Sequence, residues 1–264
     1  MKNKVPNPAP LHVIGLGPGD ASLLAPAALR CLEESSVLAG YTGYLDLLPK
    51  ALLAGKDIIA TGMRAERQRV EAAIESACGG APTSLVCSGD PGIYALAGLT
   101  LECLEKRGLH PDLLPLRVIP GIPALCAAAA LLGAPLAHDF ACVSLSDLLT
   151  PWERIRRRLE AALAADFVLV LYNPRSSRRT APLQEALRLA LERRSPSTPT
   201  GIVRNAFRPR QRVLIAPLAE IDPREADMLT ILVIGNGETR IIPGPRMLTP
   251  RGYPLDADET AFRR

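Results

Sequence analysis

The chain has 264 residues and a formal net charge of +4, and 48% of its residues are hydrophobic. This length and composition predict a soluble globular protein of one large domain or two ordinary ones, with a mostly aliphatic core because aromatic residues make up only 4%. The six cysteines form no C-x-x-C pair and the three histidines lie far from them in sequence, which excludes the usual zinc-ligand spacings, so no metal is expected.

The first half of the chain predicts alternating strands and helices. Its first residues lack the apolar core of a signal peptide, which indicates the cytoplasm. Apolar runs predict strands over 11–14, 37–40, 57–60, a run ending at Val86, and 116–119. Helical spacing predicts helices over 26–34, after Gly62, and over about 96–106. The helix after Gly62 is expected to bury Val70, Ile74 and Ala77 and to expose Arg64, Arg67 and Arg69.

A proline-rich turn at 120–123 interrupts this alternation after about five strands, so we expect two α/β domains, over 1–119 and 120–264. The uncharged run 119–137 is as long as a membrane span, but its prolines and glycines break it. It predicts a turn and a buried helix, and no contact with a membrane.

The second half repeats the alternation. The expected strands lie near 141–145, 167–172, 201–205, 212–215 and 229–234, and the strand over 167–172 is expected to be central. The expected helices run through Leu125 and Leu131, through Ile155, Leu159 and Leu163, and through Leu183, Leu187 and Leu191. The second of these is expected to start with a capping box at Thr150 and to expose Arg154, Arg157 and Arg158. Arginine dominates the charge of this half, which suits carboxylate or phosphate partners.

Two glycine-rich turns are candidate binding loops. In Gly15–Asp20 a dinucleotide fingerprint would need glycine where Asp20 stands, and a carboxylate there would repel a pyrophosphate. A ligand with adenosine but no phosphate is consistent with this turn, as is no ligand. In Ser88–Gly92 the chain breaks between a strand and a helix, so the turn either binds a ligand or uses Asp90 to cap the helix.

The segments 15–20, 88–92 and 120–122 resemble the three glycine-rich signatures of the tetrapyrrole (uroporphyrinogen/precorrin) methylases. Further segments are similar to one branch of that family, the precorrin-3B C17-methyltransferases of cobalamin biosynthesis: 40–46, 132–140, 144–152, 171–176, 202–206 and 249–253. The resemblance implies the tetrapyrrole methylase fold, two α/β domains with a cofactor cleft between them. It also implies a homodimer that uses S-adenosylmethionine to methylate C17 of a tetrapyrrole, precorrin-3B or its cobalt-containing equivalent, with ring contraction.

Carried over by position, the family's cofactor contacts fall on Pro18, Ser88, Gly89, Asp90, Ile93, Pro123, Ala124, Asn173 and Ala206. Pro123 stands where the family often has Thr or Ser, and proline donates no backbone N–H. Candidates for the acid–base work of ring contraction are His138, Asp46, Tyr44, Asp139 and Asp147. His138 is favoured because an imidazole titrates near neutral pH, although each of the five fits an ordinary turn, cap or core role equally well.

A tetrapyrrole of this kind carries acetate and propionate side chains, so arginines are candidate substrate contacts. We select Arg175, Arg204 and Arg64, and expect Arg157 to be only solvated. Two other functions stay open. One is another methylase of the same fold that acts on a different tetrapyrrole or on RNA. The other is an arginine-rich nucleic-acid-binding protein, although the chain lacks the interleaved aromatic residues of a stacking surface, and no nucleic acid is expected.

Overall fold

The computed structural model of the chain describes residues 7–110 and 113–255. Contacts within the chain divide it into two units, Met1–Ala127 and Ala128–Arg264. The division falls inside helix α6 (Ala124–Leu132), whereas the sequence suggested a boundary between residues 119 and 120. Each unit is described by itself.

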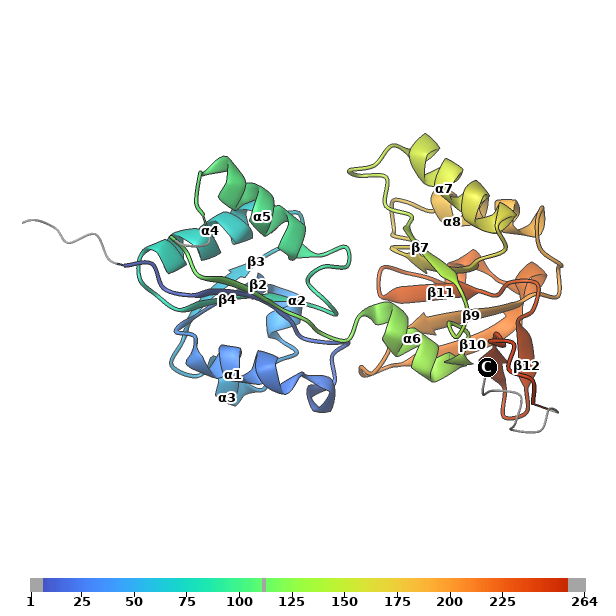
Figure 1. Cartoon of the computed structure of the whole chain (residues 1–264), viewed down its shortest axis with the longest axis horizontal. Coiled ribbons are helices and arrows are strands. Elements are labelled where there is room, and N and C mark those ends of the chain that lie inside the picture. The colour runs from blue at the N-terminus through green and yellow to red at the C-terminus, as the bar shows by residue number, and fades with distance from the viewer. Residues whose placement is uncertain (1–6, 111–112, 256–264) are drawn as a thin grey trace, which may run out of the picture. The chain divides into compact units, whose positions relative to one another are not determined.

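Unit 1 is built on five parallel strands in the order β3-β2-β4-β1-β5 (Figure 1). The strands are β1 (Leu11–Gly15), β2 (Val37–Tyr41), β3 (Asp57–Thr61), β4 (Thr83–Cys87) and β5 (Leu116–Ile119). The helices are η1 (Ala21–Leu23), α1 (Pro26–Glu34), α2 (Thr42–Leu45), α3 (Lys50–Leu53), α4 (Glu66–Cys78) and α5 (Leu96–Lys106). The parallel sheet explains the continuous apolar runs, because such strands are buried on both faces.

Alternate side chains of β1 and β4 enter two different cores. Val13 and Leu85 pack with α4 and α5, and Ile14 and Val86 pack with α1. Figure 1 shows the result, with α4 and α5 over one face of the sheet and α1 and α3 over the other. This is the period of two expected of strands covered on both sides.

The order of the strands creates a switch point between β1 and β4. These strands are neighbours, but the connections that follow them run in opposite directions across the sheet, from β1 to β2 and from β4 to β5. The helices that follow, α1 and α5, cover opposite faces of the sheet. Ligands of open α/β sheets bind at the carboxyl ends of strands at such a point. Both glycine-rich turns of the sequence lie there.

The exposed position predicted for Arg69 is wrong. Its side chain is buried, and it donates from Nε to Thr61 Oγ1 at 2.7 Å and from Nη2 to the Gly62 carbonyl at 3.0 Å. Arg69 precedes the buried Ala73 and Ala77 by one and two turns, so it points along the same face of α4. The acceptors at the end of β3 satisfy the guanidinium there.

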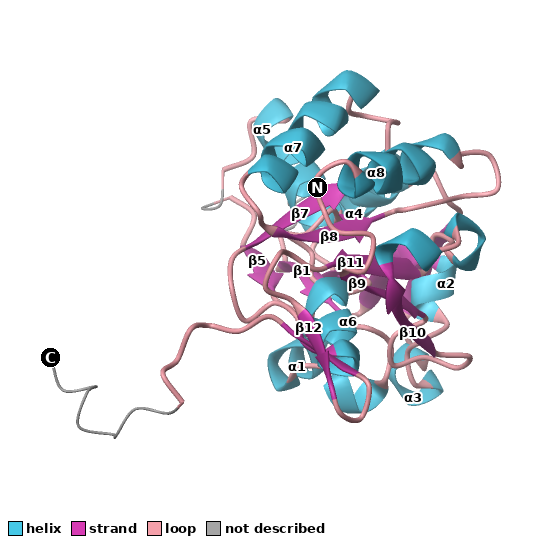
Figure 2. Ribbon diagram, turned by 90° about the vertical axis from the view of Figure 1, so that its right-hand side faces the viewer, coloured by secondary structure: helices cyan, strands magenta, loops and turns pink. Residues whose placement is uncertain are grey.

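Unit 2 holds a mixed sheet of five strands in the order β10-β9-β11-β8-β7, where β7 and β8 are parallel and the other neighbours antiparallel (Figure 2). These strands are β7 (Phe140–Ser144), β8 (Val168–Tyr172), β9 (Pro199–Arg204), β10 (Arg212–Pro217) and β11 (Thr230–Ile234). The helices are α7 (Trp152–Ala164), α8 (Ala181–Leu191), η2 (Leu218–Glu220) and η3 (Pro223–Glu225). As expected, β8 lies inside the sheet.

A third, small sheet was not predicted from the sequence. It consists of β6 (Gly133–Ala134), β12 (Arg240–Ile242) and β13 (Arg246–Leu248). These strands are two or three residues long and only Met247 on them is buried, so they carry almost no periodic apolar signal.

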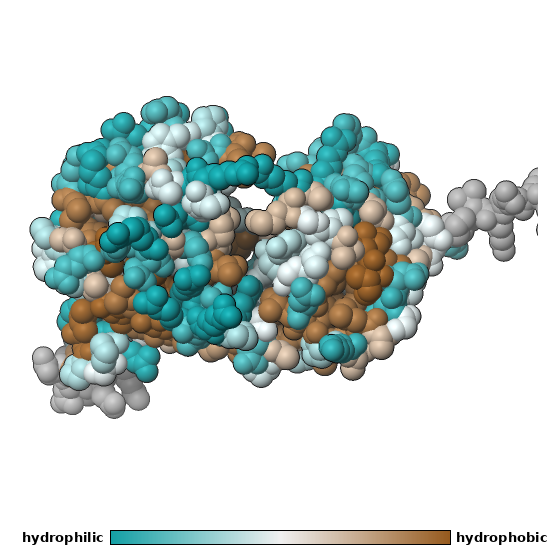
Figure 3. Space-filling model, turned by 180° about the vertical axis from the view of Figure 1, so that it is seen from behind, coloured by the Kyte–Doolittle hydropathy of each residue, from teal (hydrophilic) through white to brown (hydrophobic). Residues whose placement is uncertain are grey.

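No helix in the described residues is long and apolar enough to cross a membrane. Several large apolar side chains nevertheless stay exposed, among them Leu148 at 70% and Leu149 at 98%. On the face drawn in Figure 3, apolar residues (brown) gather in patches between hydrophilic areas. Such patches are candidate contact surfaces, because monomeric proteins seldom expose large ones.

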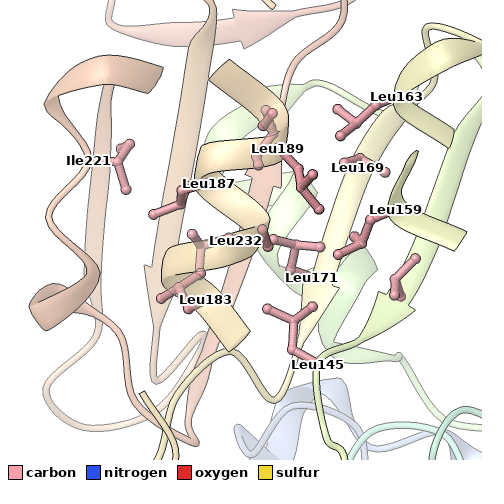
Figure 4. Close-up of a cluster of buried hydrophobic side chains, with 14 of the residues drawn as sticks. Leu145, Leu159, Leu163, Leu169, Leu171, Leu183, Leu187, Leu189, Ile221 and Leu232 are labelled. Carbon is pink, nitrogen blue, oxygen red and sulfur yellow. The ribbon is translucent and has the colours of Figure 1, made fainter. Parts of the chain in front are cut away.

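The core of unit 2 lies between its five-stranded sheet and the helices α7 and α8 (Figure 4). The buried Ile155, Leu159 and Leu163 of α7 confirm the prediction, but the expected cap at Thr150 is wrong. The N-cap is Pro151, and no side chain caps the helix. Of the three leucines predicted on one face of α8, Leu183 and Leu187 are buried, whereas Leu191, the last residue of the helix, is 41% exposed.

Candidate functional site

Three glycine loops meet at the switch point of unit 1. The Gly17 N–H donates to the Gly89 carbonyl at 3.1 Å, and the Gly89 N–H donates back to the Gly17 carbonyl at 2.8 Å. A Cβ at Gly121 would lie 2.2 Å from Gly89 O, and a Cβ at Gly15 would lie 2.5 Å from the same atom. Backbone therefore packs on backbone, and positions 15 and 121 admit only glycine. The loops that follow β1, β4 and β5 form one cluster.

Asp90 holds two of these loops together. Its Oδ1 accepts the Gly92 N–H at 2.8 Å, and its Oδ2 accepts the Gly121 N–H at 3.1 Å. Helix α5 begins after Ala95 without a side-chain cap, so the alternative in which Asp90 caps this helix is wrong. The carboxylate instead fixes the turn after β4 and ties it to the loop after β5.

We expect Asp90→Ala to lower the free energy of unfolding by about 1–3 kcal/mol, because the partly buried Gly121 N–H loses its acceptor. Asp20→Ala is the matched control, since Asp20 is exposed and its carboxylate binds only Ser22. Urea unfolding measures both. Equal effects of the two substitutions would show that Asp90 does not link the loops.

The charge of the loop cluster selects against phosphate. The segments 15–20, 88–94 and 120–124 contain no Lys or Arg. They contain Asp90 and the exposed Asp20, and hydrogen bonds from the Ser22 side chain and backbone hold the pKa of Asp20 below its usual value. Both carboxylates oppose a pyrophosphate, and the cluster suits a neutral or cationic ligand.

Seven of the nine residues expected to contact a cofactor lie in this cluster. They are Pro18, Ser88, Gly89, Asp90, Ile93, Pro123 and Ala124. The Pro123 carbonyl accepts the N–H groups of Cys126 and Ala127 and so starts α6. At the start of a helix the backbone N–H has no partner within the helix, so proline costs α6 no hydrogen bond. Sequence positions more than 100 residues apart are thus brought to one place. Their contact with a cofactor stays a prediction.

The other two expected cofactor residues, Asn173 and Ala206, lie in unit 2 and follow β8 and β9. Both strands run antiparallel to β11, and β7 is parallel to β8, so the carboxyl ends of β7, β8 and β9 share one edge of the sheet. Asn173 Nδ2 donates to Ser144 Oγ at 3.0 Å, which joins two of these ends. We call this the loop edge of unit 2.

Two of the three candidate substrate arginines, Arg175 and Arg204, also lie at the loop edge. Arg204 Nη2 is 2.7 Å from Asp227 Oδ2, while its Nε is buried and has no hydrogen-bond partner among the described residues. Arg175 is half-buried in the loop after β8. Arg64 is in unit 1 and exposed just before α4, with a backbone φ of 65°. The structure therefore gathers Arg175 and Arg204 and leaves Arg64 in the other unit.

The five acid–base candidates do not form one group. His138 and Asp139 precede β7, whereas Asp147 follows it at the loop edge, so they lie at opposite ends of one strand. His138 Nδ1 accepts the Asp139 N–H at 2.7 Å. In unit 1, the ring of Tyr44 packs on Tyr41 with centroids 5.1 Å apart, and Asp46 is exposed after α2. Their catalytic roles stay predictions.

Sequence reasoning missed Arg179 at the loop edge. Its side chain is only 13% exposed and contacts several loops. It stands in the polar segment Arg175–Arg179, which reads as a solvated turn, so no sequence signal set it apart. Among the described residues, no group of three or more His, Cys, Asp or Glu side chains could hold a metal ion.

A family sequence model identifies the protein family to which this chain belongs. The sequence model of the Tetrapyrrole (Corrin/Porphyrin) Methylases matches residues 10–222. This chain belongs to the tetrapyrrole methylase family. The match runs through all three glycine loops of unit 1 and the loop edge of unit 2 as far as β9 and β10.

Relatives of this methylase cover nearly its whole length. It is 44% identical to the "Probable cobalt-factor III C(17)-methyltransferase" of Salmonella typhimurium, over 93% of this chain and 100% of the relative. It is 44% identical to the "Cobalt-factor III methyltransferase" of Priestia megaterium over 92% of this chain, but it spans only 45% of that relative. It is 40% identical to the "Precorrin-3B C(17)-methyltransferase" of Sinorhizobium sp, over 88% of this chain and 91% of the relative.

Solved structures agree with the family. The methyltransferase CobJ matches this methylase with a TM-score of 0.85 and 36% identity, over 92% of this chain and 100% of CobJ. The uroporphyrin-III C-methyl transferase of Thermus thermophilus, solved in complex with S-adenyl homocysteine, matches with a TM-score of 0.63 and 25% identity over 86% and 97% of the two chains. The expected fold, two α/β domains of the tetrapyrrole methylase type, is confirmed.

Proposed function

We propose that this methylase transfers a methyl group from S-adenosylmethionine to C17 of a corrinoid precursor, precorrin-3B or its cobalt-containing equivalent, with contraction of the ring. The observation that carries the proposal is the 44% identity with the C(17)-methyltransferase relative of Salmonella typhimurium, which extends over 93% of one chain and 100% of the other. The relatives carry both cobalt-factor and precorrin names, so the proposal covers both forms of the substrate.

The loop cluster of unit 1 fits this cofactor better than it fits a dinucleotide. S-adenosylmethionine has an adenosine and a cationic sulfonium but no phosphate, and the cluster has two carboxylates and no Lys or Arg. Tight backbone packing at Gly15, Gly89 and Gly121 gives the loops a fixed shape before any ligand arrives. A fixed shape favours binding, because less ordering entropy is lost.

Bound S-adenosylmethionine supplies an already activated methyl group, so the chain needs no nucleophilic side chain. The residues of the chain have to hold the methyl group and the ring carbon in line. Such positioning of reactants can account for a large part of an enzyme's rate enhancement. Arg175 and Arg204 at the loop edge would bind carboxylates of the macrocycle. For the proton transfers of ring contraction, Asp147 has the advantage of lying at the same edge of the sheet.

The homodimer implied by the resemblance and the cytoplasmic location expected from the first residues of the sequence are part of this proposal. An exposed apolar edge strand supports the dimer: β10 has one neighbour in its sheet, and Val213 and Leu214 on it are 42% and 39% exposed. Such an edge is a ready surface for another chain. Light scattering on the purified protein would give the number of copies.

Isothermal calorimetry with S-adenosylmethionine and with NADH tests the choice of cofactor. We expect saturable binding of S-adenosylmethionine and no heat from NADH, because Asp20 and Asp90 place negative charge where a pyrophosphate would lie. Tight NADH binding with no signal from S-adenosylmethionine would overturn the proposed function.

A further inference from the structure

Arg179 contacts three separate loops of unit 2 with one guanidinium group. Its Nη1 donates to the Leu145 carbonyl after β7, and its Nη2 donates to the Asn173 carbonyl after β8 at 2.8 Å. Nη2 also lies 3.7 Å from Met228 Sδ, just before β11, and Nε lies 3.8 Å from Asp147 Oδ1. The three loops are far apart in sequence but lie together at the loop edge.

Only an arginine can make this set of contacts. The guanidinium is planar and presents five N–H donors in fixed directions, so its two ends reach carbonyls of different loops at once. Lysine would supply the charge from a single point. The side chain of Arg179 is 13% exposed, and burial lowers the pKa of its guanidinium against the opposing effect of Asp147. Burying a charge is costly, so this group stays buried only because its partners compensate for the lost water.

We call these contacts of Arg179 the clamp. One residue of the clamp is Asn173, which is held from two sides. Its carbonyl accepts from Arg179, and its side-chain Nδ2 donates to Ser144 Oγ at 3.0 Å. Its backbone φ is 49°, in the left-handed region that non-glycine residues rarely adopt. A residue in such a conformation persists where its surroundings fix it, and such sites are often functional. Arg179 supplies a large part of these surroundings.

We propose that Arg179 is a positioning residue that locks the loops after β7 and β8 and before β11 into the arrangement in which unit 2 binds its ligands. The role of these loops in ligand binding rests on the proposed function. The clamp itself is a property of unit 2 and is measurable without any substrate. Arg179 is not proposed to touch a reacting atom; it acts through Asn173 and Asp147.

The test compares Arg179→Met and Arg179→Lys with Arg178→Met, a control at the exposed neighbouring arginine. Hydrogen exchange is followed at 145–150, 173–178 and 227–229. Arg179→Met is expected to speed exchange in all three segments together by about tenfold or more, the scale of one lost charge-assisted hydrogen bond, and to leave β8 as in the parent. Arg179→Lys should restore little of this protection, and Arg178→Met should change nothing.

Methyl-transfer kinetics give the second readout. Arg179→Met should lower kcat/KM by about tenfold or more, with a raised KM as well as a lowered kcat, because misplaced loops weaken binding and orientation together. A merely stabilising side chain would reduce the folded fraction and leave KM unchanged. Parental exchange in the three segments, or a parental KM, would overturn the proposal. If the parent protein methylates no corrinoid precursor, the proposed function fails, and the exchange result still decides whether the clamp exists.

Discussion

Gly121→Ala is expected to unfold the loop cluster of unit 1 and to abolish cofactor binding. The new Cβ would lie 2.2 Å from Gly89 O and 2.8 Å from the carbonyl carbon and oxygen of Gly15. All three are backbone atoms of neighbouring loops, so no flexible side chain can move aside. We expect the free energy of unfolding to fall by about 3 kcal/mol, at the upper end of the usual cost of overpacking.

Gly98→Ala is the matched control for this substitution. Gly98 lies in α5, and apart from the backbone of its own helix a Cβ there would meet no atom of the described residues within 4 Å. Alanine in a helix is about 0.5–1 kcal/mol more favourable than glycine, so Gly98→Ala should raise the melting temperature slightly. Thermal unfolding and calorimetry with S-adenosylmethionine measure both variants. If Gly121→Ala melts and binds like the parent, the packing of three backbones described for this cluster is wrong.

Removal of either cationic side chain at the loop edge is expected to weaken substrate binding. Arg175→Ala and Arg204→Ala should each raise the apparent KM for the tetrapyrrole by about tenfold or more, the scale of one lost charge-assisted hydrogen bond. The affinity for S-adenosylmethionine should be nearly unchanged. Arg204→Ala should also lower the stability somewhat, because Asp227 Oδ2 loses its ion-pair partner at 2.7 Å.

Arg157→Ala is the control for charge alone, since Arg157 is exposed on α7 and lies outside the loops that follow β7, β8 and β9. It should leave KM unchanged. Raising the ionic strength should weaken substrate binding in the parent protein and have less effect in the two loop-edge variants, because salt screens the charges that they lack. Three variants that all behave like the parent, or a damaging Arg157→Ala, would show that the substrate does not bind at this edge.

Periodicity in the sequence predicted the elements with a buried face. The strands of unit 1 have continuous apolar runs because both faces are covered, and α1 and α5 have the predicted bounds. The small third sheet was missed because its strands are short and bury a single residue, Met247. Arg69 was misplaced because a charged residue on the inner face of a helix breaks the pattern, and its acceptors, Thr61 and Gly62, are visible only in the fold.

The parts of the candidate site that consist of residues close together in the sequence could be predicted. The contacts between residues far apart in the sequence could not. The three glycine loops could be selected from the sequence, but the acceptor role of Asp90 toward Gly121, 31 residues away, could not. His138 was favoured because of its residue type, since an imidazole titrates near neutral pH. The residue type does not show at which end of β7 the side chain lies. Arg179 shows the same limit, because Leu145, Asp147 and Met228, which it contacts, lie in other loops of unit 2.

The proposed function requires that this methylase places one methyl group on C17. The most direct measurement incubates the protein with S-adenosylmethionine labelled in its methyl group and with precorrin-3B or its cobalt-containing equivalent, and then examines the product by mass spectrometry and carbon NMR. We predict a product that is heavier by one labelled methyl group, with the label attached to C17. Label on another carbon, or no labelled product from either precursor while S-adenosylmethionine binds, would show that the proposed function is wrong.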